Sequence, residues 1–506
     1  MSGSATTAPS RSGLGDHLTF GIEYEFLVPY LFSDENDPLK HVDDLSPLFR
    51  IYRNNPIKED ELVVYDTLTK LFDSHGLPTK VGACKYDSDF AKKILDRYSY
   101  WNIDEDESVQ EPEFNNPYAL ASKYKWINVE IATPAEPDIQ IAYDTSRYVL
   151  QLLQRTYRVR VNLSCGLHVH VGKGVERFDL REMKRIGSLI WSTEHLLGSF
   201  NHPVRQVSYH APTVRTRSIM SGFPKPFSGP QHEWSTSSGE VWNCGRYIST
   251  DVRPGEEPAS WREQNQEPEI VEAFQRTRQE GHYEPFQWNS PDAPSTAAEA
   301  KPTQKTRPII FEQEFRTNPQ GTGRTPRVRT LPQLVTRPNE EHEKMLEGFE
   351  EVLETYRGNI TFTHREADPG VWEGVRQLSQ APTACDIAYL LRVGSRSYVS
   401  TTNYICTRIA SSTDPRTIEF RCAEGTLSDW SITWGRICVG LIKFAIQSST
   451  AEFLNVIDKC DLSMREGGRF DCIDLLDAIG LPTEAELAER HIQENSEEWR
   501  IQFLDT

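Results

Sequence analysis

The amino-acid sequence predicts an α+β protein in which a sheet with one apolar face and one polar face is covered by helices. Four short segments alternate apolar residues with Glu, His or Arg, which is the pattern of strands buried on one side. Between and after them run longer segments in which apolar residues recur at helical spacing. At 506 residues the chain has ample material for a large core.

The clearest of the four strand segments is the first, 18–28 (LTFGIEYEFLV). Its apolar face carries Phe20, Ile22, Tyr24, Phe26 and Val28. Glu23 and Glu25 project side by side from the other face. Carboxylates this close repel each other and are costly to bury unless a cation lies between them. The segment therefore indicates a metal site.

The other three segments repeat this design. They are 126–131 (WINVEI), 166–171 (GLHVHV) and 417–422 (TIEFRC), and they carry Glu130, His168 and His170, and Glu419 and Arg421 respectively. If the four strands share one sheet, its polar face combines several carboxylates with two imidazoles and a guanidinium. Sites rich in carboxylates prefer Mg²⁺ or Mn²⁺, whereas sites rich in His and Cys prefer zinc. The residue types here favour magnesium.

Each segment also has a simpler interpretation when it is taken alone. Two acids two residues apart occur on solvated strand faces, and an HxH pair can serve phosphate binding or a satisfied core as well as a metal. The EFR segment can be an ion pair within one strand. The acids of 101–109 (WNIDEDESV) are most simply a solvated turn. The combination of the segments is what favours a functional site.

The segments between the strands predict helices and a crossover. Residues 29–80 mix apolar residues, acids and prolines, which indicates an elaborated surface crossover. Residues 138–159 are expected to form a helix, with Ile141, Val149, Leu152 and Leu153 at near-helical spacing. The next helix is expected at about 180–198, where Asp179 and Glu182 have the spacing of a capping box.

The second half of the chain contains a stretch of different character. Residues 221–337 are rich in Pro, Gln, Ser, Glu and Arg, which predicts an insertion or long loops. Helices are expected at 339–356, at 385–391, from a cap at Ser428 to about 447, at 473–478 and at 485–493. Thr483 and Glu486 have the capping-box spacing for the last of these.

Composition limits the partners. The net charge of −19 argues against nucleic acid or an anionic membrane as a partner. No apolar run is long enough to span a bilayer, and residues 1–17 indicate a disordered tail rather than a signal peptide. Nine cysteines without CxxC pairs favour reduced thiols in a cytoplasmic protein. Residues 18–506 are expected to form a single catalytic domain.

The order of the motifs adds a resemblance. GIEYEF, WNIDEDESV, WINVEI with Thr-Pro at its end, CGLHVHVG and TIEFRCAEGT together resemble the putative amidoligase family, which is related to glutamine synthetase and glutamate–cysteine ligase. The resemblance covers most of 18–205 and 397–447. It implies a glutamine synthetase-like fold with a curved, mainly antiparallel sheet and helices on its apolar face.

The resemblance also implies roles for individual residues. It implies metal ligands at Glu23, Glu25, Glu130 and Glu419; catalytic roles for Arg421, His168 and Asp106; contacts to the nucleotide from His170, Arg421 and Arg205; and weaker matches at Ser108 and Asn403. The implied reaction joins a small-molecule or peptide carboxylate to an amine, using ATP and Mg²⁺ or Mn²⁺ and an acyl-phosphate intermediate. No Walker-type loop is present, so the nucleotide is expected to be held by metal and arginine.

Three other functions compete with the ligase. A hydrolase would use a metal on the pair His168 and His170, but such enzymes usually need more His ligands than the strands supply. A phosphotransferase of the related guanidino-kinase type would leave a stable phosphorylated product. A non-enzymatic scaffold would not need the intact acidic, HxH and EFR segments. The sequence indicates neither the substrates nor an oligomeric state.

Overall fold

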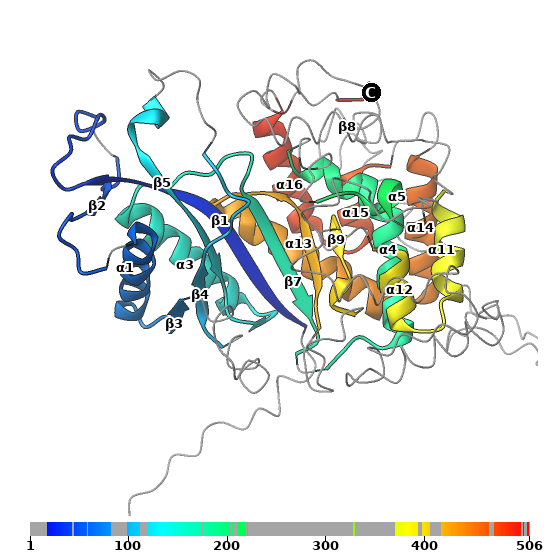
Figure 1. Ribbon diagram of the computed structural model, residues 1–506. Coiled ribbons are helices and arrows are strands. Elements are labelled where there is room, and N and C mark those ends of the chain that lie inside the picture. The colour runs from blue at the N-terminus through cyan, green and yellow to red at the C-terminus, as the bar shows by residue number, and fades with distance from the viewer. Residues whose placement is uncertain are drawn as a thin grey trace, which may run out of the picture.

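The computed structural model describes residues 18–42, 45–57, 59–81, 99–111, 120–174, 176–202, 205, 211–218, 220, 327–328, 370–392, 397–404, 416–464, 470–496, 499 and 503–504. A sheet occupies one side of the described part, and a group of helices packs on the other side (Figure 1). None of the described helices combines the length and the apolar composition that a membrane crossing requires.

The sheet is open and largely antiparallel. Its strand order is β3-β4-β5-β1-β7-β10-β9, and β2 and β6 also pair with β1. The strands are β1 (Thr19–Phe32), β2 (Phe49–Ile51), β3 (Thr79–Val81), β4 (Trp101–Asp104), β5 (Lys125–Ala132), β6 (Glu136–Pro137), β7 (Gly166–Gly172), β9 (Val399–Ser400) and β10 (Ile418–Glu424). Only the β1–β2 and β3–β4 pairs of this sheet are parallel. The four segments predicted to form one sheet are therefore four adjacent strands, β5, β1, β7 and β10, and the predicted α+β class is confirmed.

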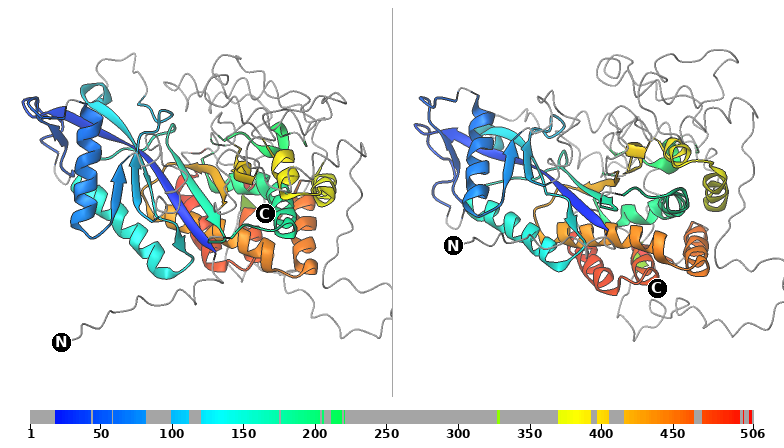
Figure 2. Two further views of the ribbon diagram at one scale, coloured as in Figure 1. Left: turned by 60° about the horizontal axis from the view of Figure 1, so that its bottom comes forward. Right: turned by 90° about the horizontal axis from the view of Figure 1, so that it is seen from below.

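Three helices cover the apolar face of the sheet, namely α1 (Asp60–Ser74), α3 (Gln140–Thr156) and α13 (Asp429–Gln447). Figure 2 shows α3 and α13 lying across this face. The ring of Phe20 stacks on Tyr143 of α3 at 4.4 Å, and Phe72 of α1 meets the edge of Trp101 at 5.8 Å. Burying side chains of this kind contributes about 1.5–3 kcal/mol each to stability. The covered apolar face leaves the opposite face to the polar residues.

Helix α4 (Leu180–Leu197) is the centre of the helical side. Every side chain from position 183 to position 197 is buried, so α4 is surrounded by other elements. Its neighbours include α5 (Val214–Arg217), α11 (Val371–Gln380), α12 (Ala384–Leu390), α13, α14 (Thr450–Ser463) and α15 (Cys472–Ala478). The predicted capping box of Asp179 and Glu182 is present, and Ser428 caps α13 as predicted.

The predicted surface crossover at 29–80 is wrong. Strand β1 continues to Phe32, and the segment then forms β2, α1 and β3. Its apolar residues Val64, Leu68 and Phe72 lie one turn apart on one side of α1 and are buried against the sheet. The prolines lie outside α1, so they do not interrupt it.

Two predictions about helix ends and faces are also wrong. Helix α16 (Pro482–Asn495) has Leu481 at its N-cap and no side-chain cap, so Thr483 and Glu486 do not form a capping box. Proline is well suited to the first helical position because its φ is already helical and its missing N–H has no partner to lose. Ile141 of α3 is 66% exposed rather than part of the core.

Several predictions fall on residues that the structure does not describe. The predicted tail at 1–17, the helix at 339–356 and all of the insertion at 221–337 except 327–328 lie outside the described residues. Those two residues form β8 (Arg327–Val328), which pairs with β11 (Phe503–Leu504). Within the described part, Cys165, Cys422, Cys438, Cys460 and Cys472 are buried and free of disulfides, as expected for reduced thiols.

Candidate functional site

The pairing register of the strands gathers the predicted polar residues on one face of the sheet. Glu25 of β1 lies opposite Glu130 of β5, and Asp104 of β4 lies opposite Glu130 from the other side. Glu23 lies opposite His168 of β7. Because strand side chains alternate between faces, these residues and their neighbours two positions away project together. The four predicted segments therefore make one continuous polar surface.

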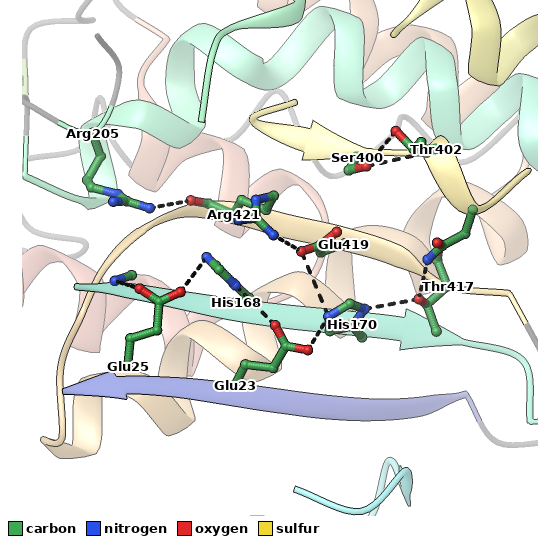
Figure 3. A network of polar contacts seen from close by, with 12 residues as sticks. Glu23, Glu25, His168, His170, Arg205, Ser400, Thr402, Thr417, Glu419 and Arg421 are labelled. Carbon is green, nitrogen blue, oxygen red and sulfur yellow. Dashed lines mark hydrogen bonds and ion pairs between the residues drawn. The ribbon is translucent and has the colours of Figure 1, made fainter. Parts of the chain in front are cut away.

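His168 lies between the two glutamates of β1 (Figure 3). Its Nδ1 is 3.1 Å from Glu23 Oε2 and its Nε2 is 3.3 Å from Glu25 Oε1. Its side chain is 3% exposed, so these contacts are shielded from solvent. The second oxygen of Glu25 accepts a hydrogen bond of 2.5 Å from the backbone N–H of Gly166. Both ring nitrogens of His168 thus face carboxylates in this structure.

His170 of β7 lies between a carboxylate of β1 and a carboxylate of β10. Its Nε2 lies 3.1 Å from Glu23 Oε1 and 3.9 Å from Glu419 Oε1. Burial lowers the pKa of His170, but the negative charge and hydrogen bond of Glu23 outweigh this and raise that pKa to about 9. Burial likewise raises the pKa of Glu23, but the charge of His170 and hydrogen bonds from both histidines bring that pKa well below its ordinary value. These opposite shifts indicate a charged ion pair.

The β4–β5 end of the site is acidic. Burial raises the pKa of Glu130 well above its ordinary value, and the nearby carboxylates of Glu23, Glu25 and Asp106 add to the shift. Asp106 lies in the turn after β4, where its Oδ1 accepts a hydrogen bond from the N–H of Ser108 at 2.7 Å. The structure brings Asp106 close to two strand glutamates, so its turn belongs to the site and is not merely a solvated loop.

The donor atoms on this surface are spaced for cations. Three groups each offer one ligand atom per residue within 4.8 Å of the others: Glu23, His170 and Glu419; Glu23, Glu130 and His168; and Glu25, Asp106 and Glu130. Carboxylate oxygens dominate all three groups, and hard divalent cations such as Mg²⁺ and Mn²⁺ prefer such ligands. The shared members Glu23 and Glu130 would place neighbouring cations side by side. The donor set therefore fits the predicted metal.

The β10 end of the site carries the positive charge. Arg421 pairs with Glu419 two residues before it, and both side chains are largely buried. Arg205, which is 3% exposed, donates a hydrogen bond of 3.0 Å from Nη2 to the backbone oxygen of Arg421. Burial lowers the pKa of Arg205, whereas Glu419 and Glu25 outweigh burial at Arg421 and raise the pKa of that guanidinium. Two guanidinium groups beside the carboxylates suit the binding of an anion.

One polar residue of this face was missed by the strand pattern. The β7–β10 register shifts between Phe420 and Ala423, which places one extra residue on β10. Strict alternation would turn Glu424 towards the apolar face, but the bulge brings it opposite Gly166 on the polar face. Its Oε2 accepts a hydrogen bond of 2.8 Å from the N–H of His202. The signal in the sequence is the pair of consecutive apolar residues, Cys422 and Ala423.

The weaker matches lie at the edges of the site. Asn403 does not reach the carboxylates; its Nδ2 donates to Thr417 Oγ1 at 3.1 Å, and the same Thr417 oxygen lies 3.1 Å from Nδ1 of His170. Thr417 itself was not singled out from the sequence, although alternation places it on the same face as Glu419 and Arg421. The nine residues assigned roles from the sequence all lie in the described part, at or beside this polar surface.

Comparison with known proteins gives one match. Residues 16–209 match a family model described as putative amidoligase enzyme. Neither the curated proteins nor the solved structures yielded a match. The matched segment includes β1, β4, β5, β7 and Arg205, and it ends before β10.

Proposed function

We propose that the chain is an ATP- and Mg²⁺-dependent carboxylate–amine ligase. The match over residues 16–209 supports its assignment to the putative amidoligase family, which is an enzyme family of the ligase type. The observation that carries the proposal is the shared polar face of β5, β1, β7 and β10. It combines three overlapping sets of cation donors with two buried arginines. An amide or isopeptide product requires both an activated acid and an amine. This surface offers cation donors and guanidinium groups for the first and further carboxylates for the second.

Glu23, Glu25, Glu130, His170 and Glu419 are proposed to hold Mg²⁺ or Mn²⁺. When bound, such a cation neutralises the charge of nucleotide phosphates and of the phosphoryl group that is transferred. In its absence the protonated ring of His170 supplies part of the positive charge that Glu23 needs. The donors therefore lie in place before a cation arrives, which reduces the reorganisation that binding requires.

Arg421 and Arg205 are proposed to bind the phosphate oxygens and the acid that is activated. The side chain of Arg421 is 16% exposed, and its partner Glu419 fixes it on β10. A guanidinium held in a site of low water content stabilises developing negative charge more strongly than one in solvent. Activation of the acid as an acyl phosphate would then make its carbonyl reactive towards an amine.

The acidic end is proposed to receive the amine. Its carboxylates attract an ammonium group, and one of them must accept a proton before the amine can attack. Asp106 and Glu130 both lie there. Glu130 is one of the proposed cation ligands, so Asp106 is the candidate for the general base. The position of Asp106 beside Glu25 and Glu130 supports a general base at this end of the surface.

The test measures phosphate release and organic products together. The full-length chain is incubated with ATP, Mg²⁺ and mixed pools of carboxylic acids and amines, and mass spectrometry follows the organic products. The expected result is pool-dependent phosphate release with a product lighter than acid plus amine by one water. Glu25→Ala and Glu419→Ala should abolish turnover while the far-UV circular dichroism stays unchanged.

Other outcomes would support a different function for the chain. A stable phosphorylated product would replace the ligase by a phosphotransferase. Turnover that needs zinc and no ATP would replace it by a hydrolase. Normal turnover in both glutamate variants would overturn the assignment of the site.

A further inference from the structure

Thr417 lies outside the set of cation donors but contacts one of them. Its Oγ1 is 3.1 Å from Nδ1 of His170, on the side of the ring that faces away from the carboxylates. The opposite nitrogen, Nε2, is the atom that lies 3.1 Å from Glu23 and 3.9 Å from Glu419 (Figure 3). Thr417 can therefore act on the ring through Nδ1, the nitrogen that faces away from Glu23 and Glu419.

The local packing fixes the direction of the Thr417 hydroxyl. A Cβ atom built on Gly172 would lie 3.2 Å from Thr417 Cγ2, so the methyl group fits closely over this glycine. Threonine is stiff at χ1 because it is branched at Cβ, and a seated methyl therefore sets the position of the oxygen. The strand pairing of Ile418 with Val171 holds Thr417 beside the end of β7.

Asn403 donates a hydrogen bond to the same oxygen atom of Thr417. Its Nδ2 lies 3.1 Å from Thr417 Oγ1 and 3.4 Å from the backbone oxygen of Thr417. A backbone carbonyl can only accept, so the amide group of Asn403 must turn its NH₂ towards Thr417. Asn403 then uses one lone pair of Oγ1, and the second lone pair remains for His170.

Two forms of the His170 ring are compatible with the carboxylates around Nε2. In the first, Nε2 carries a hydrogen and pairs with Glu23; in the second, Nε2 is bare and offers its lone pair to a cation. In both forms Nδ1 carries a hydrogen, and Thr417 Oγ1 can accept it. The hydrogen bond to Thr417 therefore need not change when a cation replaces the proton.

We propose that Thr417 is a positioning residue that accepts a hydrogen bond from Nδ1–H of His170 and so keeps the Nε2 lone pair available to a divalent cation between Glu23 and Glu419. The inference rests on the proposed function, because it concerns the same cation site. Outer partners of metal-binding histidines fix the ring tautomer and its orientation, and their removal typically weakens metal binding about 10- to 100-fold.

The experiment compares two substitutions at Thr417 in the full-length protein. Thr417→Val keeps the shape but removes the acceptor, and Thr417→Ser keeps the acceptor. Mn²⁺ alone is the probe, and electron paramagnetic resonance counts the bound ions. We expect Thr417→Val to weaken binding about 10- to 100-fold and Thr417→Ser to stay close to the unaltered protein. Thr433→Val is the matched control, since the Thr433 hydroxyl donates within α13 to Asp429 at 3.4 Å.

Nitrogen NMR of protein labelled at its histidines shows which ring nitrogen carries the hydrogen. The signal of His170 is identified as the one that is missing from the spectrum of His170→Gln. We expect a hydrogen on Nδ1 of His170 in both the metal-free and the Mg²⁺-loaded protein. Unchanged Mn²⁺ binding in Thr417→Val, or equal losses in the Val and Ser variants, would overturn the proposal. A ring hydrogen on Nε2 alone would also overturn it. Failure of the unaltered protein to bind Mn²⁺ would instead remove the cation site from the proposed function, and the NMR result would still decide the direction of the hydrogen bond.

Discussion

At the scale of single residues, charged groups of both signs lie next to one another across one surface. The carboxylates of β5 and β1 are followed by His168 and His170 of β7, and then by Glu419 and Arg421 of β10, with Arg205 beside them. The arginines each lie close to a carboxylate, so the opposite charges partly compensate one another within the surface.

Arg421 gives the first prediction at this scale. Arg421→Lys keeps the charge but removes the planar fork that binds two oxygens at once, so kcat/KM for phosphate release should fall about 100-fold. Arg376→Lys is the control, because Arg376 is exposed and pairs with Glu373 on α11 away from the sheet. Activity within a few-fold of the unaltered enzyme would show that Arg421 acts only through its charge.

His170 gives a prediction about pH. Its pKa is raised to about 9, so at pH 7 a proton occupies the ring and must leave Nε2 when a cation binds there. Mn²⁺ affinity should therefore rise about tenfold per pH unit between about 7 and 9 and level off above that range. Calorimetry in two buffers of different ionisation enthalpy should detect the released proton. A flat affinity profile would contradict cation binding through Nε2.

The same shift has a consequence for the stability of the metal-free protein. Because the folded pKa of His170 lies above the unfolded value, the protonated ring stabilises the fold fully below about pH 6.5, and this contribution is lost as the pH rises through about 9. Urea unfolding of His170→Gln should show a weaker decline of stability over that interval than the unaltered protein. An equal decline would mean that other groups cause it.

At the scale of elements, the sequence predicted the strands better than their surroundings. The segments around Glu23, Glu130, His168 and Glu419 were predictable because alternation has a period of two and each segment carries its own signal. Their adjacency could be expected only as a hypothesis, because it depends on pairings between residues far apart in the chain. The bulge that moves Glu424 to the polar face arises from the same long-range pairing, and alternation alone cannot predict it.

Thr417 was missed for a related reason. Its role depends on the distance to His170, which lies almost 250 positions earlier in the chain. Alternation places Thr417 on the polar face of its segment, but it does not show which residue of another strand the hydroxyl contacts. In contrast, α1 was missed although its apolar residues have helical spacing, because the acids and prolines of 29–80 suggested a loop. The burial of these apolar residues against β4 stabilises α1 within this segment.

Helix packing gives a prediction with an unusual sign. Replacing a helical glycine by alanine normally stabilises a helix by roughly 1 kcal/mol. A Cβ atom on Gly374 of α11 would lie only 2.0 Å from Nε1 of Trp191 in α4. Gly374→Ala should therefore destabilise the protein by about 1–3 kcal/mol in urea unfolding. Glu373→Ala on the exposed side of the same helix is the control and should change stability by less than about 0.5 kcal/mol.

At the scale of the whole molecule, the recognised family segment and the functional surface do not coincide. The family match ends at residue 209, yet Glu419 and Arg421 lie on β10, which pairs with β7 inside the matched segment. Helix α13 follows β10 and covers the apolar face of β1 and β7. A fragment limited to the matched residues would therefore lose part of the site and part of its core together.

That coupling gives the last prediction. A fragment of residues 1–220 should unfold without a cooperative transition and bind no Mn²⁺, because the apolar surface of β1 and β7 beneath α13 and the edge of β7 would be exposed to water. Co-expression with a second fragment, 370–506, should restore both properties, since these two stretches contain all the residues assigned to the site. Calorimetry and Mn²⁺ titration of the separate and combined fragments provide the measurement. Cooperative unfolding and Mn²⁺ binding by 1–220 alone would show that the matched segment is a complete unit and that β10 is an addition to it.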